Sequence, residues 1–299
     1  MYKILLLSFG LFFSSGVMSQ EEDLLSLLGE EETTDYADAS FKTNRVINLH
    51  SLENTANGVL DFKISHRFNP LNNGFYDLFG LDGANIRLGF DYGINDRLMV
   101  GVGRSSFEKT YDGFVKYKFL RQSSGKKVMP ITAALLLTSA INTLRWTNPD
   151  RENLFNSRLA YTTQLIVGRK FSESFSLQLS PTMVHRNLVA TLAEKNDVFA
   201  LGVGTRLKLS KRVAINGEYI YLLPDQVASN VQNSLSIGFD IETGGHVFQL
   251  HFTNSRSMIE KGFIAESTGK WNTSFDGIHF GFNVSRVFTV KNKKIDEKH

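Results

Sequence analysis

Residues 86–92, Ile-Arg-Leu-Gly-Phe-Asp-Tyr, place an apolar side chain at every second position. Successive side chains of a β-strand point to opposite faces, so a period of two gives the strand one apolar face and one polar face. The same alternation recurs in residues 60–65, 203–209, 235–242 and 278–284. These segments predict strands that separate an apolar environment from a wet one.

Weaker matches bring the set to about twelve runs of strand length. The runs cover residues 59–68, 84–94, 97–104, 110–120, 128–140, 157–171, 174–186, 197–209, 212–222, 233–243, 246–254 and 274–290. Runs of ten or more residues are long for a soluble sandwich but match the roughly 9 to 11 tilted residues that cross a membrane. The pattern favours an all-β, up-and-down antiparallel transmembrane barrel. A periplasmic sandwich or a lipocalin-like barrel is the alternative.

The connections between the runs alternate in length. Four even-numbered connections are minimal turns, at Asn95-Asp96, Ser172-Glu173, Ser210-Lys211 and Gly244-Gly245. Most odd-numbered ones are longer, at residues 69–83, 141–156, 187–196, 223–232 and 255–273. Outer-membrane barrels have short periplasmic turns and long external loops, so both ends of the barrel are expected in the periplasm. A short third connection at 105–109 and a long fourth one at 121–127 depart from this rule.

The first 19 residues have the composition of a secretory signal peptide. Lys3 supplies the positive charge, an apolar run follows from Ile4 to Phe13, and short side chains precede a cleavage site before Gln20. The apolar run is too short for a stable membrane-spanning helix. An exported chain with this strand pattern is expected in the outer membrane of a Gram-negative cell.

Residues 20–57 are predicted to form a periplasmic leader that precedes a barrel at 58–290 and a polar tail at 291–299. Between Glu21 and Asp38 the leader has eight acidic residues and no Lys or Arg. Its leucines fit a short amphipathic helix. Either the leader is solvated, or these leucines bind a periplasmic or outer-membrane partner or plug the lumen. The candidate residues are Leu24, Leu25, Leu27 and Leu28.

If the apolar face of each strand meets lipid, the polar positions face the lumen. The predicted lumen-facing residues are Asp61, Lys63, Arg87, Asp91, Lys116, Lys118, Arg206, Lys208, Glu218, Asp240, Glu242, His251 and His279. Acidic and basic groups are interspersed in this set. They could pair into an ion network that fills the interior, or line a narrow aqueous path that selects small solutes.

No catalytic, metal-binding or cofactor-binding signature stands out. Ser65 and His66 are adjacent and therefore point to opposite faces, while His251 is two residues from Thr253, the wrong nucleophile for a barrel phospholipase. The seven histidines are dispersed and form no metal-ligand pair. Cysteine is absent, which excludes disulfides and a lipidated cysteine, and a net charge of +3 gives no footprint for nucleic acid.

Residues 77–89, Asp-Leu-Phe-Gly-Leu-Asp-Gly-Ala-Asn-Ile-Arg-Leu-Gly, begin a series of short motifs that continues through residues 92–93, 95–98, 100–105 and 109–117. This series resembles an uncharacterised family of Bacteroidota outer-membrane β-barrel proteins, a domain of unknown function, most densely over residues 59–122. The resemblance implies the barrel fold and an origin in that phylum. It transfers no activity and no functional residue.

The sequence therefore predicts a non-enzymatic barrel whose partner is outer-membrane lipid. A small-solute channel with a charged lumen is the leading hypothesis for its function. The alternative is an anchor or interaction component of an envelope assembly, held through the acidic leader or the long loops. A lipid-modifying enzyme is a remote alternative that would need a Ser–His pair within hydrogen-bond reach near one rim.

Overall fold

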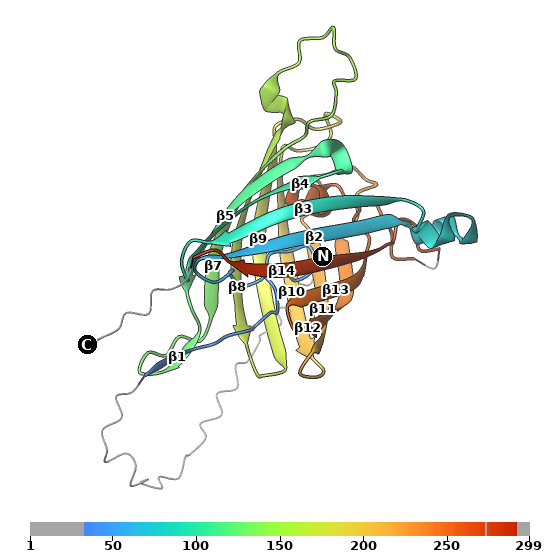
Figure 1. Ribbon diagram of the computed structural model, residues 1–299. Coiled ribbons are helices and arrows are strands. Elements are labelled where there is room, and N and C mark those ends of the chain that lie inside the picture. Colours follow the sequence, from blue (N-terminus) through green and yellow to red (C-terminus); the bar gives the residue numbers. More distant parts are fainter. Residues whose placement is uncertain (1–32, 273, 292–299) are drawn as a thin grey trace, which may run out of the picture. The chain divides into compact units, whose positions relative to one another are not determined.

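The computed structural model describes residues 33–272 and 274–291. Within them, twelve antiparallel strands form a closed barrel, in which each strand pairs with its neighbours along the chain (Figure 1). The strands are β2 (Val59–Pro70), β3 (Ala84–Gly93), β4 (Leu98–Ser105), β5 (Tyr111–Leu120), β7 (Thr132–Ile141), β8 (Leu159–Lys170), β9 (Phe175–Arg186), β10 (Asp197–Lys208), β11 (Val213–Leu222), β12 (Ser234–Thr243), β13 (His246–Thr253) and β14 (His279–Thr289). The predicted fold class is confirmed.

The barrel closes where the last strand pairs with the first. β14 runs antiparallel to β2 from His279 opposite Pro70 to Thr289 opposite Val59, with one irregularity between His279 and Gly281. Each of the twelve predicted runs overlaps one barrel strand. The largest boundary errors are at the start of two runs, because β7 begins at Thr132 rather than 128 and β14 at His279 rather than 274.

The two ends of the barrel differ as the connection lengths predicted. Four minimal turns and both ends of the barrel chain lie at one end, and the long loops lie at the other. By the general rule for outer-membrane barrels, we assign the short-turn end to the periplasm and the long-loop end to the outside. The long fourth connection, at the short-turn end, contains strand β6 (Ser123–Gly125), which pairs with β1 (Thr34–Tyr36) in a separate two-stranded sheet.

The outer surface is apolar because one face of every strand carries aliphatic and aromatic side chains. Ile86, Leu88 and Phe90 on β3 are all exposed, as are Ile237 and Phe239 on β12. Exposed apolar area of this extent on every strand is suited to contact with lipid acyl chains.

The helices are short and lie in the connections between strands. They are η2 (Leu71–Asn73), η3 (Phe75–Gly80), η4 (Phe107–Lys109), η5 (Phe155–Arg158) and α1 (Glu260–Ala265). None of the helices in the described part of the chain has the length and hydropathy of a membrane span.

Candidate functional site

The interior of the barrel is occupied by the chain that precedes β2. In this inner segment, residues 39–57, every residue from Thr43 to Leu52 is buried. The segment folds back on itself, with Val46 N donating to Leu49 O at 2.8 Å and Ser51 N to Asn44 O at 3.0 Å. The expectation that residues up to 57 form a solvated leader is therefore wrong for its last part. The acidic run ends at Asp38, and apolar residues with partners inside the barrel follow it.

One side of the inner segment packs into an apolar cluster. Phe41, Val46, Leu49 and Leu52 are at most 2 % exposed. Their neighbours in the cluster come from the inward faces of seven strands: Met99, Phe114, Leu136, Ile166, Val184, Val198, Ala200, Ile220 and Leu222. Each fully buried aliphatic or aromatic side chain contributes about 1.5–3 kcal/mol relative to exposure. The interior is thus not uniformly wet, which the alternation alone did not predict.

The tip of the inner segment is bound by the carboxylate of Glu218 on β11. Three consecutive backbone N–H groups donate to it, those of Ile47 at 3.2 Å, Asn48 at 2.9 Å and Leu49 at 3.0 Å. The Asn48 side-chain amide adds a fourth donor at 2.8 Å, and its oxygen accepts from Arg67 Nη2 at 2.8 Å. Charge-assisted bonds of this kind are about twice as strong as neutral ones.

Amides on the wall satisfy the carbonyl groups of the inner segment. Gln249 Nε2 donates to Val46 O at 2.9 Å and Asn283 Nδ2 to Ile47 O at 3.1 Å. Gln178 Nε2 donates to His50 O at 2.7 Å. An irregular segment can be buried only if its backbone finds such partners, and the wall provides them from β9, β13 and β14.

Charged residues on β2, β3 and β5 surround the other side of the segment. Asn44 bridges two of them, because its amide donates to Asp91 at 2.8 Å and its oxygen accepts from Lys63. Lys63 Nζ also lies 3.5 Å from Asp61 and 3.8 Å from Asp91. On β5, Lys116 Nζ donates to Ser51 O at 3.1 Å. The segment is therefore part of the ion network of the wall.

The long-loop end is filled by a second element, the inner loop, residues 254–267, which contains α1 and is mostly buried. Phe263 and Ile264 are fully buried in the apolar cluster. Glu260, on the first turn of α1, meets the inner segment: its Oε1 lies 2.7 Å from Arg45 Nη1 and 3.5 Å from His50 Nε2. Burial is the main cause that lowers the pKa of His50 well below its ordinary value, with the positive charges of Arg45 and Lys116 acting in the same direction.

All thirteen residues predicted to face the lumen lie on the inward side of the wall. Lys118, Lys208 and Glu242 are half-buried, and the others are buried. Glu242, near the short-turn end, pairs with Lys42 of the inner segment at 2.7 Å. Asp240 accepts from Gln249 at 2.8 Å, and His279 Nδ1 lies 2.7 Å from Phe68 O. Arg206 and His251 also point inward, the latter with no hydrogen-bond partner for its ring nitrogens among the described residues.

Several residues of the site were missed by the sequence reasoning. Arg67 and Asp112 continue the period of two on strands where it was already noticed, so the alternation could have found them. The Asp112 carboxylate accepts hydrogen bonds from both Nε and Nη2 of Arg87. Asn44, Asn48 and Glu260 have no such signal, because they lie outside the strands. The four leucines proposed as a plug, Leu24, Leu25, Leu27 and Leu28, lie outside the described residues.

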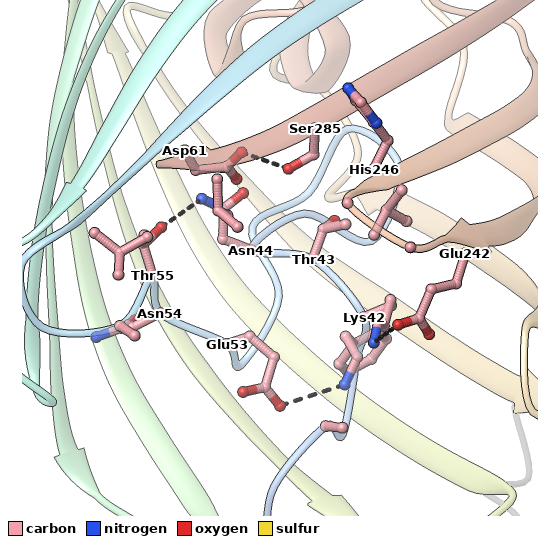
Figure 2. A pocket seen from close by; sticks show the side chains of 18 residues that line it. Lys42, Thr43, Asn44, Glu53, Asn54, Thr55, Asp61, Glu242, His246 and Ser285 are labelled. Atoms are coloured by element: carbon pink, nitrogen blue, oxygen red, sulfur yellow. Dashed lines mark hydrogen bonds and ion pairs between the residues drawn. The ribbon is translucent and has the colours of Figure 1, made fainter. Parts of the chain in front are cut away.

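Cavities remain at both ends of the filled interior. The one at the short-turn end has a volume of about 470 Å³ and is lined by residues of the inner segment, β2, β12, β13 and β14. Figure 2 shows Lys42 directed at Glu242 across this cavity, and Asp61 bonded to Ser285 behind it. Two cavities of about 550 and 320 Å³ lie at the long-loop end. Between the ends, beside Arg45 and Asn48, a void of only about 10 Å³ remains.

The residues that the structure describes contain no group of three or more His, Cys, Asp or Glu side chains placed to hold a metal ion. Several ionisable groups of the interior, among them Glu218, Lys63 and Lys116, are bonded to the inner segment or to one another.

A family model matches residues 41–288, most of the chain, and is described as a membrane bound beta barrel domain, DUF5777. The chain belongs to this family. The matched range begins at Phe41, so the DUF5777 domain of this protein includes the inner segment as well as the strands. With a closed barrel and an apolar exterior, the protein is a β-barrel of the outer membrane, where the sequence predicted it.

Solved structures show weaker likeness to this DUF5777 chain. The NanC porin has a TM-score of 0.47 at 7% identity, over 77% of this chain and 98% of that one. A Salmonella typhi OmpF complex with Daunomycin has a TM-score of 0.36 at 6% identity, over 77% and 97%. The translocator domain of the autotransporter NalP from Neisseria meningitidis has 0.34 at 12%, over 79% and 91%. Such scores carry no information on cargo. Among curated proteins, none matches.

Proposed function

We propose that the protein is a small-solute channel that the inner segment closes in the conformation described here. The observation that carries the proposal is the way the segment is held. Polar side chains of the wall, among them Glu218, Gln249 and Asn283, bind its backbone. When the segment leaves, the same groups would be exposed to water and would line a path of mixed charge.

The positions of the cavities support this proposal. The inner segment and the inner loop separate the cavity at the short-turn end from the cavities at the long-loop end. Each hydrogen bond lost on release would be exchanged for one to water, at a net cost of about 0.5–1.5 kcal/mol. Exposing the buried apolar side chains would add to this cost, so the closed state is favoured. Release of the segment would then require an opening signal or a rare fluctuation.

Conductance in planar bilayers tests the proposal. We would compare the mature chain, a deletion of residues 20–57 and a deletion of residues 20–38, which removes the acidic run and leaves the inner segment. Heat-modifiable migration on gels verifies that each variant has folded. We expect ion-selective steps from the larger deletion and much rarer ones from the other two chains.

If the protein that lacks residues 20–57 folds but shows no conductance, the channel proposal is contradicted. That result would favour the second candidate function, a membrane anchor, which one observation supports independently: the inner segment, α1 and the wall share a single apolar cluster. A barrel filled in this way is stable without ever conducting. Co-purification of a partner that depends on residues 20–38 would then identify the assembly.

We further propose that the role is non-enzymatic. Near the long-loop rim, His185 Nδ1 lies 2.6 Å from Asp197 Oδ1. On the neighbouring strand the residue opposite His185 is Tyr161, not a serine. A phospholipase assay on the refolded protein is expected to give no turnover, and activity lost in His185→Ala would overturn this view. The Bacteroidota origin implied by the resemblance also remains a proposal.

A further inference from the structure

The smaller cavity at the long-loop end, of about 320 Å³, is unlike the rest of the interior in its charge. It lies between the β7–β8 loop, the end of β9 and the inner loop. Four cationic residues line it, Arg145, Arg158, Arg186 and Lys261, and none of the described residues that line it is acidic. Its size falls within the range of pockets for small molecules.

The guanidinium group of Arg158 is held in place by hydrogen bonds from only one of its three nitrogens. Its Nη1 donates to the carbonyl oxygens of Asn142 at 2.8 Å and Leu144 at 2.6 Å. Its Cζ lies 3.7 Å from the centre of the Trp146 ring, which holds the guanidinium plane. Among the described residues, no acceptor is bonded to Nε or Nη2.

Nε and Nη2 are the two parallel donors that fit the oxygens of one carboxylate. The same chain shows this arrangement filled, because Arg87 uses Nε and Nη2 to bind both oxygens of Asp112. The Arg158 fork has the same donors beside a cavity, and no carboxylate of the described residues binds it.

The other cations that line the cavity differ in how far their charge is already neutralised. Arg186 is 2% exposed, and its Nε has no partner among the described residues. Lys261 and Arg186 share the carboxylate of Glu266, at 3.2 and 3.6 Å. Each also has a second carboxylate, Glu108 at 3.4 Å from Lys261 and Glu194 at 3.1 Å from Arg186. The charge left for a bound anion is therefore that of Arg158 and Arg145, which have no ion pair among the described residues.

We infer that this cavity binds a small organic anion, with its carboxylate on the Nε and Nη2 atoms of Arg158 and its carbon skeleton beside Trp146. This inference deepens the proposed channel function, on which the role of the anion as a transported solute rests. Binding itself needs no open lumen, so the two can fail separately.

Equilibrium binding to the folded full-length mature chain in detergent tests the site. The probe is glucuronate, followed by tryptophan fluorescence and by calorimetry, with glucose as the matched neutral compound. We expect saturable binding of glucuronate only. Arg158→Gln should weaken it by about tenfold or more, since a hydrogen-bonded charge pair is lost, and Arg158→Lys should restore little because lysine lacks the fork.

Arg151→Gln is the control variant, because Arg151 is an exposed arginine of the same loop that does not line the cavity. Equal affinity in Arg158→Gln and Arg151→Gln would overturn the inference. So would binding of lipopolysaccharide without binding of free glucuronate, which would assign the cations to the membrane surface. If no variant conducts in bilayers but glucuronate still binds, the channel proposal fails and the anion-binding site stands.

Discussion

Arg45 and Glu260 are 215 residues apart in the chain and form an ion pair of 2.7 Å in the middle of the barrel. Arg45 belongs to the inner segment and Glu260 to the inner loop, so the pair joins the element that enters from the periplasmic side to the one that enters from outside. Both side chains are nearly inaccessible, at 6% and 3% exposure. The position of the loop is thereby linked to the position of the segment.

Replacing Glu260 by Leu should destabilise the closed state by about 3 kcal/mol or more, because it leaves the Arg45 charge buried without a partner. Conductance steps should become more frequent, and the unfolding midpoint in urea should fall. The double variant Arg45→Met with Glu260→Leu removes both charges and should recover most of the loss. A double variant as unstable as the single one would show that the pair itself is not the cause.

A side chain at position 202 should displace the inner segment from its bound position inside the barrel. A Cβ there would lie 3.1 Å from Leu49 Cδ1, closer than an ordinary contact. Gly202→Leu is expected to raise the open probability severalfold in bilayers. The control is Gly113→Ala, where a Cβ would meet nothing closer than 3.6 Å. Unchanged conductance from a folded Gly202→Leu protein would argue against release of the segment.

Acid should favour opening through His50. Burial, Arg45 and Lys116 hold its pKa below the ordinary value in the closed state, whereas a released segment would titrate near about 6.5. The released state thus binds the proton more readily, and the closed state weakens as the pH falls below about 6.5. Glu260 Oε1 lies 3.5 Å from His50 Nε2, yet burial and the surrounding cations keep the pKa of His50 lowered. Open probability measured from pH 7.5 to 5.5 should rise, and His50→Gln should flatten the rise while the exterior variant His185→Gln leaves it.

A charge in the middle of the apolar exterior should be costly. Phe239 lies midway along β12 and is 47% exposed on the outer surface. Phe239→Arg is expected to reduce folding stability in lipid vesicles by about 2–4 kcal/mol. Leu223→Arg, at the long-loop end of β11, should cost about 0–1 kcal/mol, as charges near the interface do. Similar costs at both positions would mean that the bilayer does not lie where the strand pattern puts it.

The strands could be predicted because successive residues of the wall face two different environments, lipid on the outside and polar groups on the inside. At Arg87 and Leu88 the neighbours differ in polarity because one side chain meets the interior and the other meets lipid. The apolar part of the interior had a signal of its own. Leu135, Leu136 and Leu137 are consecutive, which places leucine on both faces of β7.

The inner segment could not be predicted in the same way. Asn48 finds its partner Glu218 at a distance of 170 residues, and an irregular chain enclosed by a wall has no period of its own. The only local sign was the change of composition after Asp38, where acidic residues give way to Phe41, Val46 and Leu49. The position of α1 inside the barrel could not be predicted either, because six residues are too few to show a helical period.

Gly58 joins the inner segment to β2, with a φ of +73° and a Cβ position that would lie 2.6 Å from Lys291 O. The segment is therefore fastened at its carboxyl end to the rim of the barrel. From Phe41 to Gly58 an extended chain reaches at most about 3.3–3.6 Å per residue, enough to swing clear of the lumen while staying attached. After release, the effective concentration of the segment near its binding site in the lumen would be of the order of millimolar, as for ligands on short flexible linkers. Reclosure should be a first-order event, with a rate that does not depend on how much protein the membrane holds.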